Sequence, residues 1–156
     1  MKTYKSFLSF TLSLALIFIV AYASSYFLDE GKEHISKLYS WSCGLPSQNV
    51  FMILWGIVYG CMAIQMTATI SNRCLRRGIK IWLLLLSSNL LFTFCYFYLA
   101  LHYLGASLIL VSLILIFILT AFYVRNTRHL WLFSIPILSV YGYSLFLSVV
   151  VVLGFN

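Results

Sequence analysis

The chain has 156 residues, of which 63% are hydrophobic and only 8% are charged, and its mean hydropathy is +1.01. A soluble domain of this size could not keep so much apolar surface away from water, so the composition excludes a soluble globular protein. The net charge of +7 does not indicate a nucleic-acid partner, because the ten lysines and arginines lie between hydrophobic segments, where membrane topology explains them. We expect an integral membrane protein with a single domain over residues 1–156 and no nucleic-acid partner.

Five stretches are apolar enough and long enough to cross a bilayer, which takes roughly 20 residues per helix. Continuous apolar runs without strict alternation favour helices over a barrel. The expected fold class is therefore all-α, a polytopic bundle of five transmembrane helices at about residues 7–28, 49–70, 79–101, 103–124 and 130–153. Little more than His102 to Gly105 separates the third stretch from the fourth, which predicts a tight antiparallel hairpin.

The first stretch allows a second interpretation. Lys2 and Lys5, the apolar run and the small residues around Ala21-Tyr22-Ala23 together resemble a signal peptide with a cleavage site. The apolar run is longer than the about 7 to 15 residues typical of signal peptides, which favours its retention as a spanning helix. Cleavage would leave four helices with the same sidedness.

One long loop, Asp29 to Gln48, joins the first two stretches. Within it Ile35, Leu38 and Tyr39 fall at one-turn spacing, as in a short amphipathic helix. This segment is either a short helix over the mouth of the bundle or a surface loop without a helix, and the residues alone leave both open.

The basic residues predict the orientation of the chain in the membrane. All but two of the ten fall on one side, whereas Lys32 and Lys37 fall on the other, together with the only acidic residues. Positively charged loops face the cytoplasm, so we expect a cytoplasmic amino terminus and an outside carboxyl terminus. The residues on the cytoplasmic side are Lys2, Lys5, Arg73, Arg76, Arg77, Lys80, Arg125 and Arg128.

The residue types exclude several kinds of chemistry. No Asp, Glu, Lys or Arg lies inside an expected span, which argues against a proton-coupled pump or an ion pathway. The three histidines are far apart in sequence and lie in loops or at helix ends, the four cysteines have no Cys-x-x-Cys spacing, and serine, histidine and acid do not form a catalytic set. We expect no metal site, no catalytic residue and no required cofactor.

Asn89 is the most informative polar residue, because it lies midway along the third apolar stretch. Its amide has two donors and one acceptor, and leaving these groups unsatisfied in hydrocarbon would cost several kcal/mol. Asn89 must therefore face a partner. That partner is either a neighbouring helix or a ligand in a cavity between helices.

The second and fifth stretches carry further candidates. Trp55 and Tyr59 lie one turn apart, and Trp55 is deeper in the span than an interfacial tryptophan usually is. Gly56 and Gly60 form a Gly-x-x-x-Gly ridge, which predicts close helix packing. Pro136 removes a helical hydrogen bond and is expected to kink the last helix and to open space beside it.

Three stretches of the chain resemble the TspO/MBR family, the tryptophan-rich sensory proteins and translocator proteins, also called peripheral-type benzodiazepine receptors. They are residues 45–51 with Trp55 and Tyr59, residues 89–93 with Tyr96 and Phe97, and Pro136 with Tyr143, Ser144 and Leu147. The resemblance covers about residue 45 to the carboxyl terminus. The sequence departs from the family pattern at Ser47, which replaces a proline, at Asn49, Phe92 and Val140, which replace tryptophans, and at Ile137, which replaces a tyrosine.

The resemblance implies a ligand site. Members of the family bind porphyrins, and cholesterol in animals, in a pocket between helices beneath the first loop, so the segment from Tyr39 to Gln48 would act as a lid. The implied partners are membrane lipid, a hydrophobic small molecule of the tetrapyrrole or sterol type, with porphyrin or haem as ligand, and a second copy in a homodimer. The implied ligand-binding residues are Pro46, Trp55, Tyr59, Asn89, Phe92, Val140, Tyr143 and Ser144.

Three functions are compatible with these residues. The leading hypothesis is a non-enzymatic receptor or transporter-like protein that holds a flat hydrophobic ligand. The alternatives are an assembly protein, in which Asn89 and the Gly56 and Gly60 ridge only contact partner helices, and an enzyme that degrades porphyrin. Val140 argues against the enzyme, because the resemblance links that activity to a tryptophan pair of which this position would supply one member.

Overall fold

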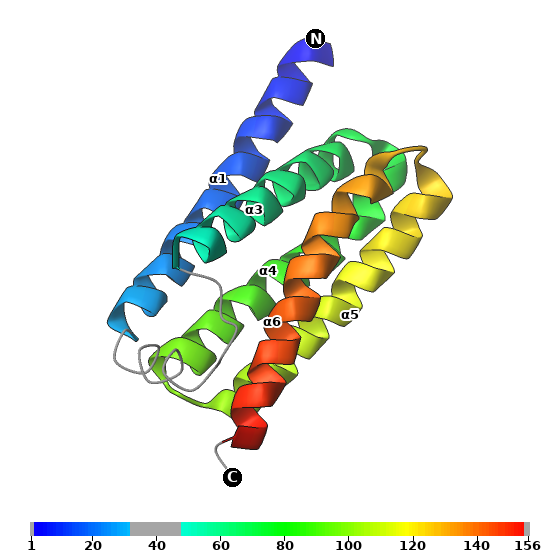
Figure 1. Ribbon diagram of the computed structural model, residues 1–156. Helices are drawn as coiled ribbons and strands as arrows, with labels where there is room; N and C mark the ends of the chain where they lie inside the picture. Colours follow the sequence, from blue (N-terminus) through cyan, green and yellow to red (C-terminus); the bar gives the residue numbers. More distant parts are fainter. Residues whose placement is uncertain (1, 32–47, 155–156) are drawn as a thin grey trace.

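A computed structural model of the chain describes residues 2–31 and 48–154 (Figure 1). These residues form helices without any strand, and five helices are long and apolar enough to cross a membrane. The predicted fold class, an all-α bundle of five membrane-spanning helices, is confirmed. The segment that was expected to form either a short helix or a surface loop lies mostly outside the described residues.

The helices begin and end close to polar residues of the sequence. α1 and α3 come first, a short 3-10 segment η1 leads into α4, and a π-helical turn η2 ends that helix; α5 follows, and a second 3-10 segment η3 leads into α6. The bounds are α1 (Lys2–Glu30), α3 (Gln48–Ser71), η1 (Arg73–Gly78), α4 (Ile79–Thr93), η2 (Phe94–Tyr98), α5 (His102–Asn126), η3 (Leu130–Phe133) and α6 (Ser134–Gly154).

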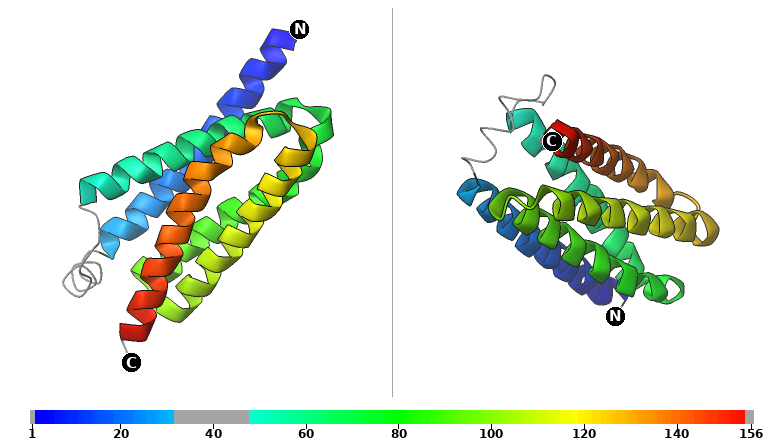
Figure 2. Two further views of the ribbon diagram at one scale, coloured as in Figure 1. Left: turned by 45° about the vertical axis from the view of Figure 1, so that its right-hand side comes forward. Right: turned by 90° about the horizontal axis from the view of Figure 1, so that it is seen from below.

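The five long helices form a closed ring. α1 packs against α3 and α4, α6 packs against α3 and α5, and α4 packs against α5, an arrangement visible from below in Figure 2. Large apolar side chains such as Phe18, Ile53, Phe117 and Phe146 are exposed on the outside of this ring. Lipid is the solvent that such a surface requires, so the chain is an integral multi-pass membrane protein.

The two ends of the bundle differ in charge, and the two chain termini lie at opposite ends (Figure 1). We call the end that carries the α3–α4 and α5–α6 connections the basic end. Six exposed cations lie in or beside these connections: Arg73, Arg76, Arg77, Lys80, Arg125 and Arg128. We call the other end, where α4 turns into α5 through residues 99–101, the hairpin end.

Buried hydrogen bonds tie the helices together near the basic end. The hydroxyl of Tyr123 accepts the indole N–H of Trp82 at 2.7 Å and lies 2.6 Å from the hydroxyl of Thr69, so α3, α4 and α5 share one polar junction. The amide of Gln65 donates to the hydroxyl of Ser134 at 2.7 Å and so joins α3 to α6. Interhelical hydrogen bonds of this kind fix helix positions where the apolar surfaces alone do not.

The hairpin between α4 and α5 is tight, as expected, but it turns earlier than expected, at residues 99–101. The amide of Leu99 donates to the carbonyl of Phe94 five residues earlier, and Ala100 adopts a φ of 53°. Gly105 is required here, because a Cβ atom at this position would lie 2.6 Å from a ring carbon of Tyr96. The left-handed Ala100 and the π turn together reverse the chain within a few residues.

The glycine ridge does not serve the purpose predicted for it. Gly56 and Gly60 are exposed, and a Cβ atom at either position would meet nothing within 4 Å in the part of the chain that the structure describes. The prediction of close packing within the bundle was wrong, because α3 turns this face outward, beside Ile53 and Ile57, and its tryptophan and tyrosine face inward.

Pro136 acts at the end of its helix and not in the middle. The irregular turn lies where η3 meets α6, between Phe133 and Ser134, about one turn before the proline. A proline ring clashes with the carbonyl four residues earlier, which here belongs to Leu132 in η3. The disturbance therefore falls at the basic end, and the predicted opening beside the candidate site does not follow from it.

Candidate functional site

Side chains from three helices meet in the centre of the ring, and we call this group the central cluster. Trp55 and Tyr59 come from α3, Asn89 and Phe92 from α4, and Tyr141 and Ser144 from α6. In each pair the two residues are three or four positions apart, which puts both side chains on one face of their helix. All are buried except Tyr59, which is half-buried.

Aromatic contacts hold one side of the central cluster together. The ring of Trp55 lies 5.7 Å from the ring of Tyr59 and 5.3 Å from the ring of Tyr141, at interplanar angles of 40° and 61°. Such tilted and edge-on arrangements are favourable between aromatic rings. Trp55 thus links α3 to α6 at the level of Asn89.

Asn89 is completely buried, and only part of its hydrogen-bonding capacity is used. Its Nδ2 donates to the hydroxyl of Tyr59 over a long 3.4 Å. Its Oδ1 has no hydrogen-bond partner among the described residues. The neighbouring helix therefore satisfies one end of the amide, and the other end faces the interior of the bundle without a partner.

Two further polar atoms of the cluster, like Asn89 Oδ1, have no hydrogen-bond partner among the described residues. The hydroxyls of Tyr141 and Ser144 are buried and have no hydrogen-bond partner within the described ranges. A buried polar group without a partner costs about 1–3 kcal/mol, and the surrounding hydrocarbon offers it no hydrogen bond. Three such atoms on two facing helices are an arrangement that a ligand with polar groups would stabilise.

The remaining predicted residues lie in different places. Val140 is half-buried and packs against the core beside the cluster. Tyr143 is half-buried too, but it follows Tyr141 by two positions, so the turn of the helix puts it on a different face of α6. Pro46 and all but the last residue of the expected lid from Tyr39 to Gln48 are outside the described residues.

Tyr141 was missed by the sequence reasoning. It is fully buried, contacts Trp55 and carries one of the unpartnered hydroxyls. Its spacing of three residues from Ser144 is a signal that could have revealed it. Ser24 of α1 was also missed; it is buried, and it accepts a 3.4 Å hydrogen bond from Thr93 on the α4 side of the cluster.

Comparison with known proteins agrees with this architecture. The model of the TspO/MBR family matches residues 12–153, which include α3, α4 and α5, most of α1 and α6, and every residue of the central cluster. No curated protein and no solved structure matches the chain significantly. The family match spans far more than half of the sequence, and the five membrane-spanning helices fit it. This integral membrane protein is therefore a member of the TspO/MBR family.

Proposed function

We propose that the protein is a membrane receptor or transporter-like protein whose central cluster binds a flat hydrophobic ligand, a tetrapyrrole such as a porphyrin or haem. The observation that carries the proposal is the set of three buried polar atoms without a partner, Asn89 Oδ1 and the hydroxyls of Tyr141 and Ser144, in the described part of the chain. These atoms lie beside aromatic rings in the centre of the bundle, and none of the buried side chains that the structure describes is charged.

The chemistry of a tetrapyrrole suits this set of groups. Its apolar macrocycle would pack against the rings of Trp55 and Phe92, and its polar groups would bond the amide oxygen and the two hydroxyls. A sterol is the alternative ligand, but its single hydroxyl would leave most of these polar atoms unsatisfied. The ligand is cargo or signal here, and the proposal requires no cofactor.

Titration with protoporphyrin IX tests this function. Purified protein in detergent is titrated and the shift of the porphyrin absorption band is recorded. Asn89→Ala and Trp55→Phe are expected to weaken binding by about ten-fold, because each removes a contact on the order of 1–2 kcal/mol. Ser139→Ala is the control, since its hydroxyl lies on an exposed position of the same bundle and bonds only the carbonyl of Ile135.

Other results of this titration would contradict the proposed site or favour a different ligand or function. Equal porphyrin affinities of the wild-type protein, the two site variants and the Ser139→Ala control would show that the ligand does not bind at the proposed site. Cholesterol that displaces the porphyrin would favour the sterol. Bleaching of the bound pigment under illumination would favour the porphyrin-degrading enzyme.

The exposed glycines favour an assembly protein as the second candidate. Gly56 and Gly60 lie on an outward face of α3 where a Cβ atom would meet nothing among the described residues, so another helix, including that of a second copy in a homodimer, could approach closely there. Chemical crosslinking in native membranes tests this candidate. A discrete complex with another protein, together with no porphyrin binding, would favour it over the receptor.

We further propose that the amino terminus is cytoplasmic and the carboxyl terminus is outside. The support is the gathering of exposed cations at the basic end, which the positive-inside rule places in the cytoplasm. Cys74 is exposed at that end and serves as the probe. In a Cys43→Ser background, a membrane-impermeant maleimide should label Cys74 only after intact cells are opened; labelling before that would reverse the orientation.

A further inference from the structure

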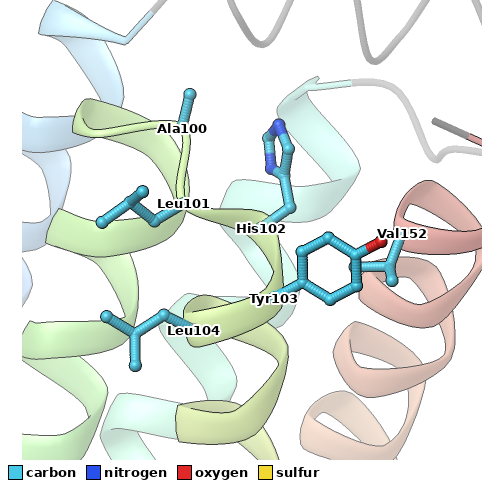
Figure 3. Close-up of a pocket in the computed structure, with 6 residues that line it drawn as sticks. All are labelled: Ala100, Leu101, His102, Tyr103, Leu104 and Val152. Carbon is cyan, nitrogen blue, oxygen red and sulfur yellow. The ribbon is translucent and has the colours of Figure 1, made fainter. Parts of the chain in front are cut away.

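A hollow of about 400 Å³ lies at the hairpin end, away from the central cluster. Figure 3 shows it between the start of α5 and the end of α6, with Tyr103 pointing toward Val152. Apart from one imidazole and one phenol, its side chains are apolar. The lining residues are Ala100, Leu101, His102, Tyr103, Leu104 and Val152.

One buried side chain, Tyr96, contacts both the lining of this hollow and the central cluster. Its ring lies 5.1 Å from the ring of His102, which lines the hollow, and 5.4 Å from the ring of Phe92, which belongs to the cluster. Tyr96 is only 5% exposed. The Tyr96 ring therefore lies between the hollow and Phe92, and the half-buried Phe97 packs against both Tyr96 and Phe92.

A stripe on α6 joins the same two places. Tyr141, Ser144, Ser148 and Val152 recur every three or four residues, so they share one face of the helix, and this face runs from the central cluster to the hollow. The three polar members are buried in a membrane-spanning helix, where apolar residues would pack at lower cost. Between the two places, Ser148 faces the hydroxyl of Tyr96.

The backbone around Tyr96 departs from a regular helix. Tyr96 lies inside the π turn η2, and the chain then passes through the left-handed Ala100. Its ring rests on Gly105, where any side chain would occupy the same space. Such π turns are rare in helices and are frequent at functional sites.

We propose that the hollow is the entrance to the central cluster and that Tyr96 is the gate residue between them. This inference rests on the proposed function, since it names the route by which an amphipathic ligand reaches Asn89. The ligand enters at the hairpin end between α5 and α6, displaces the Tyr96 ring, and moves along the polar stripe of α6.

Cysteine accessibility tests the gate without any ligand. A protein without native cysteines and with Ser144→Cys is treated in detergent with a negatively charged methanethiosulfonate, and labelling is followed by mass spectrometry. Tyr96→Ala is expected to raise the labelling rate about ten-fold or more, because it opens the path to the buried position. Tyr98→Ala is the matched control, since Tyr98 lies two residues away, is 46% exposed and stacks on Phe94. The native cysteines to be replaced are Cys43, Cys61, Cys74 and Cys95.

Two further measurements guard against general loosening of the fold. Ser112→Cys is buried in α5, where Ser112 bonds Ser88, and should stay unlabelled in the Tyr96→Ala protein. Tyr96→Leu, a smaller change in volume, should also speed labelling of Ser144→Cys. Unchanged labelling of Ser144→Cys in both Tyr96 variants would overturn the gate, and so would equal acceleration at Ser112→Cys or in Tyr98→Ala.

Binding kinetics separate this proposal from the function on which it rests. In stopped-flow mixing with protoporphyrin IX, Tyr96→Ala should accelerate association and dissociation together, so that Kd changes much less than either rate. Absence of porphyrin binding in the wild-type protein would contradict the proposed function. The cysteine labelling would still decide whether Tyr96 blocks access from the hollow to the central cluster. Normal binding with unchanged rates in Tyr96→Ala would contradict the gate alone.

Discussion

Asn89→Leu is expected to weaken protoporphyrin IX binding by about ten- to a hundred-fold and to leave the free energy of unfolding unchanged or slightly raised. Leucine has a similar volume and removes a buried acceptor that has no partner among the described residues. Within residues 2–31 and 48–154, the side-chain hydrogen bond that is lost is the long one to Tyr59, at 3.4 Å. Replacing an unsatisfied polar group with an apolar group of the same shape costs little or is stabilising.

Gln65→Leu is the matched control, since it removes the other buried amide of α3 and α4. The Gln65 amide donates to Ser134 Oγ at 2.7 Å and to the carbonyl of Leu130 at 3.1 Å, so its loss leaves both partners unsatisfied. We expect a loss of about 2–4 kcal/mol in stability with no change in porphyrin affinity. Thermal unfolding in detergent and the absorption titration measure the two quantities. If Asn89→Leu destabilised the protein as much as Gln65→Leu and left the affinity intact, Asn89 would be a packing residue.

Tyr123→Phe is expected to lower stability by about 2–4 kcal/mol, because one hydroxyl serves two buried partners. The indole N–H of Trp82 loses its acceptor, the hydroxyl of Thr69 loses its 2.6 Å contact, and all three side chains are almost completely buried. Since this junction lies toward the basic end, porphyrin affinity should not change.

Tyr22→Phe provides the comparison for this effect. Tyr22 is 75% exposed on α1, so removal of its hydroxyl should shift stability by less than about 0.5 kcal/mol. Both variants are compared by their thermal unfolding midpoints in the same detergent. Equal midpoints would mean that the junction around Tyr123 does not hold the helices together.

The sequence predicted the fold class and drew attention to Asn89 for simple physical reasons. Apolar stretches of spanning length have few alternatives in a membrane, and an amide in the middle of one of them must be accommodated. The structure has five such helices, and Asn89 is fully buried in their centre. These features depend on composition and position along the chain, which are visible without a structure.

The rotation of each helix about its axis could not be predicted in the same way. In a soluble protein the polar face indicates the outside, but here the lipid-facing side is as apolar as the core, as exposed Ile53 and buried Val58 illustrate. The glycine ridge was therefore placed against a neighbouring helix although it faces outward. On α6 the resemblance to the family pointed to Tyr143, whereas the sequence did not show that Tyr141 contacts Trp55.

Long-range polar pairs were equally invisible. The indole of Trp82 and the hydroxyl of Tyr123 are 41 residues apart in sequence, and nothing in either stretch identifies the other as its partner. The tight hairpin was predicted, but the left-handed Ala100 and the π turn before it were not. Neither was the close approach of the Tyr96 ring to Gly105 at this turn.

The central claim is that a flat hydrophobic ligand lies between α3, α4 and α6 and bonds Asn89. The most direct measurement is an experimental structure of the protein purified with protoporphyrin IX. We predict density for the macrocycle beside Trp55 and Phe92, with a polar group of the ligand within hydrogen-bonding distance of Asn89 Oδ1. Porphyrin bound only on the outer, lipid-facing surface, with Trp55 still in contact with Tyr59 and Tyr141 as it is here, would contradict the claim.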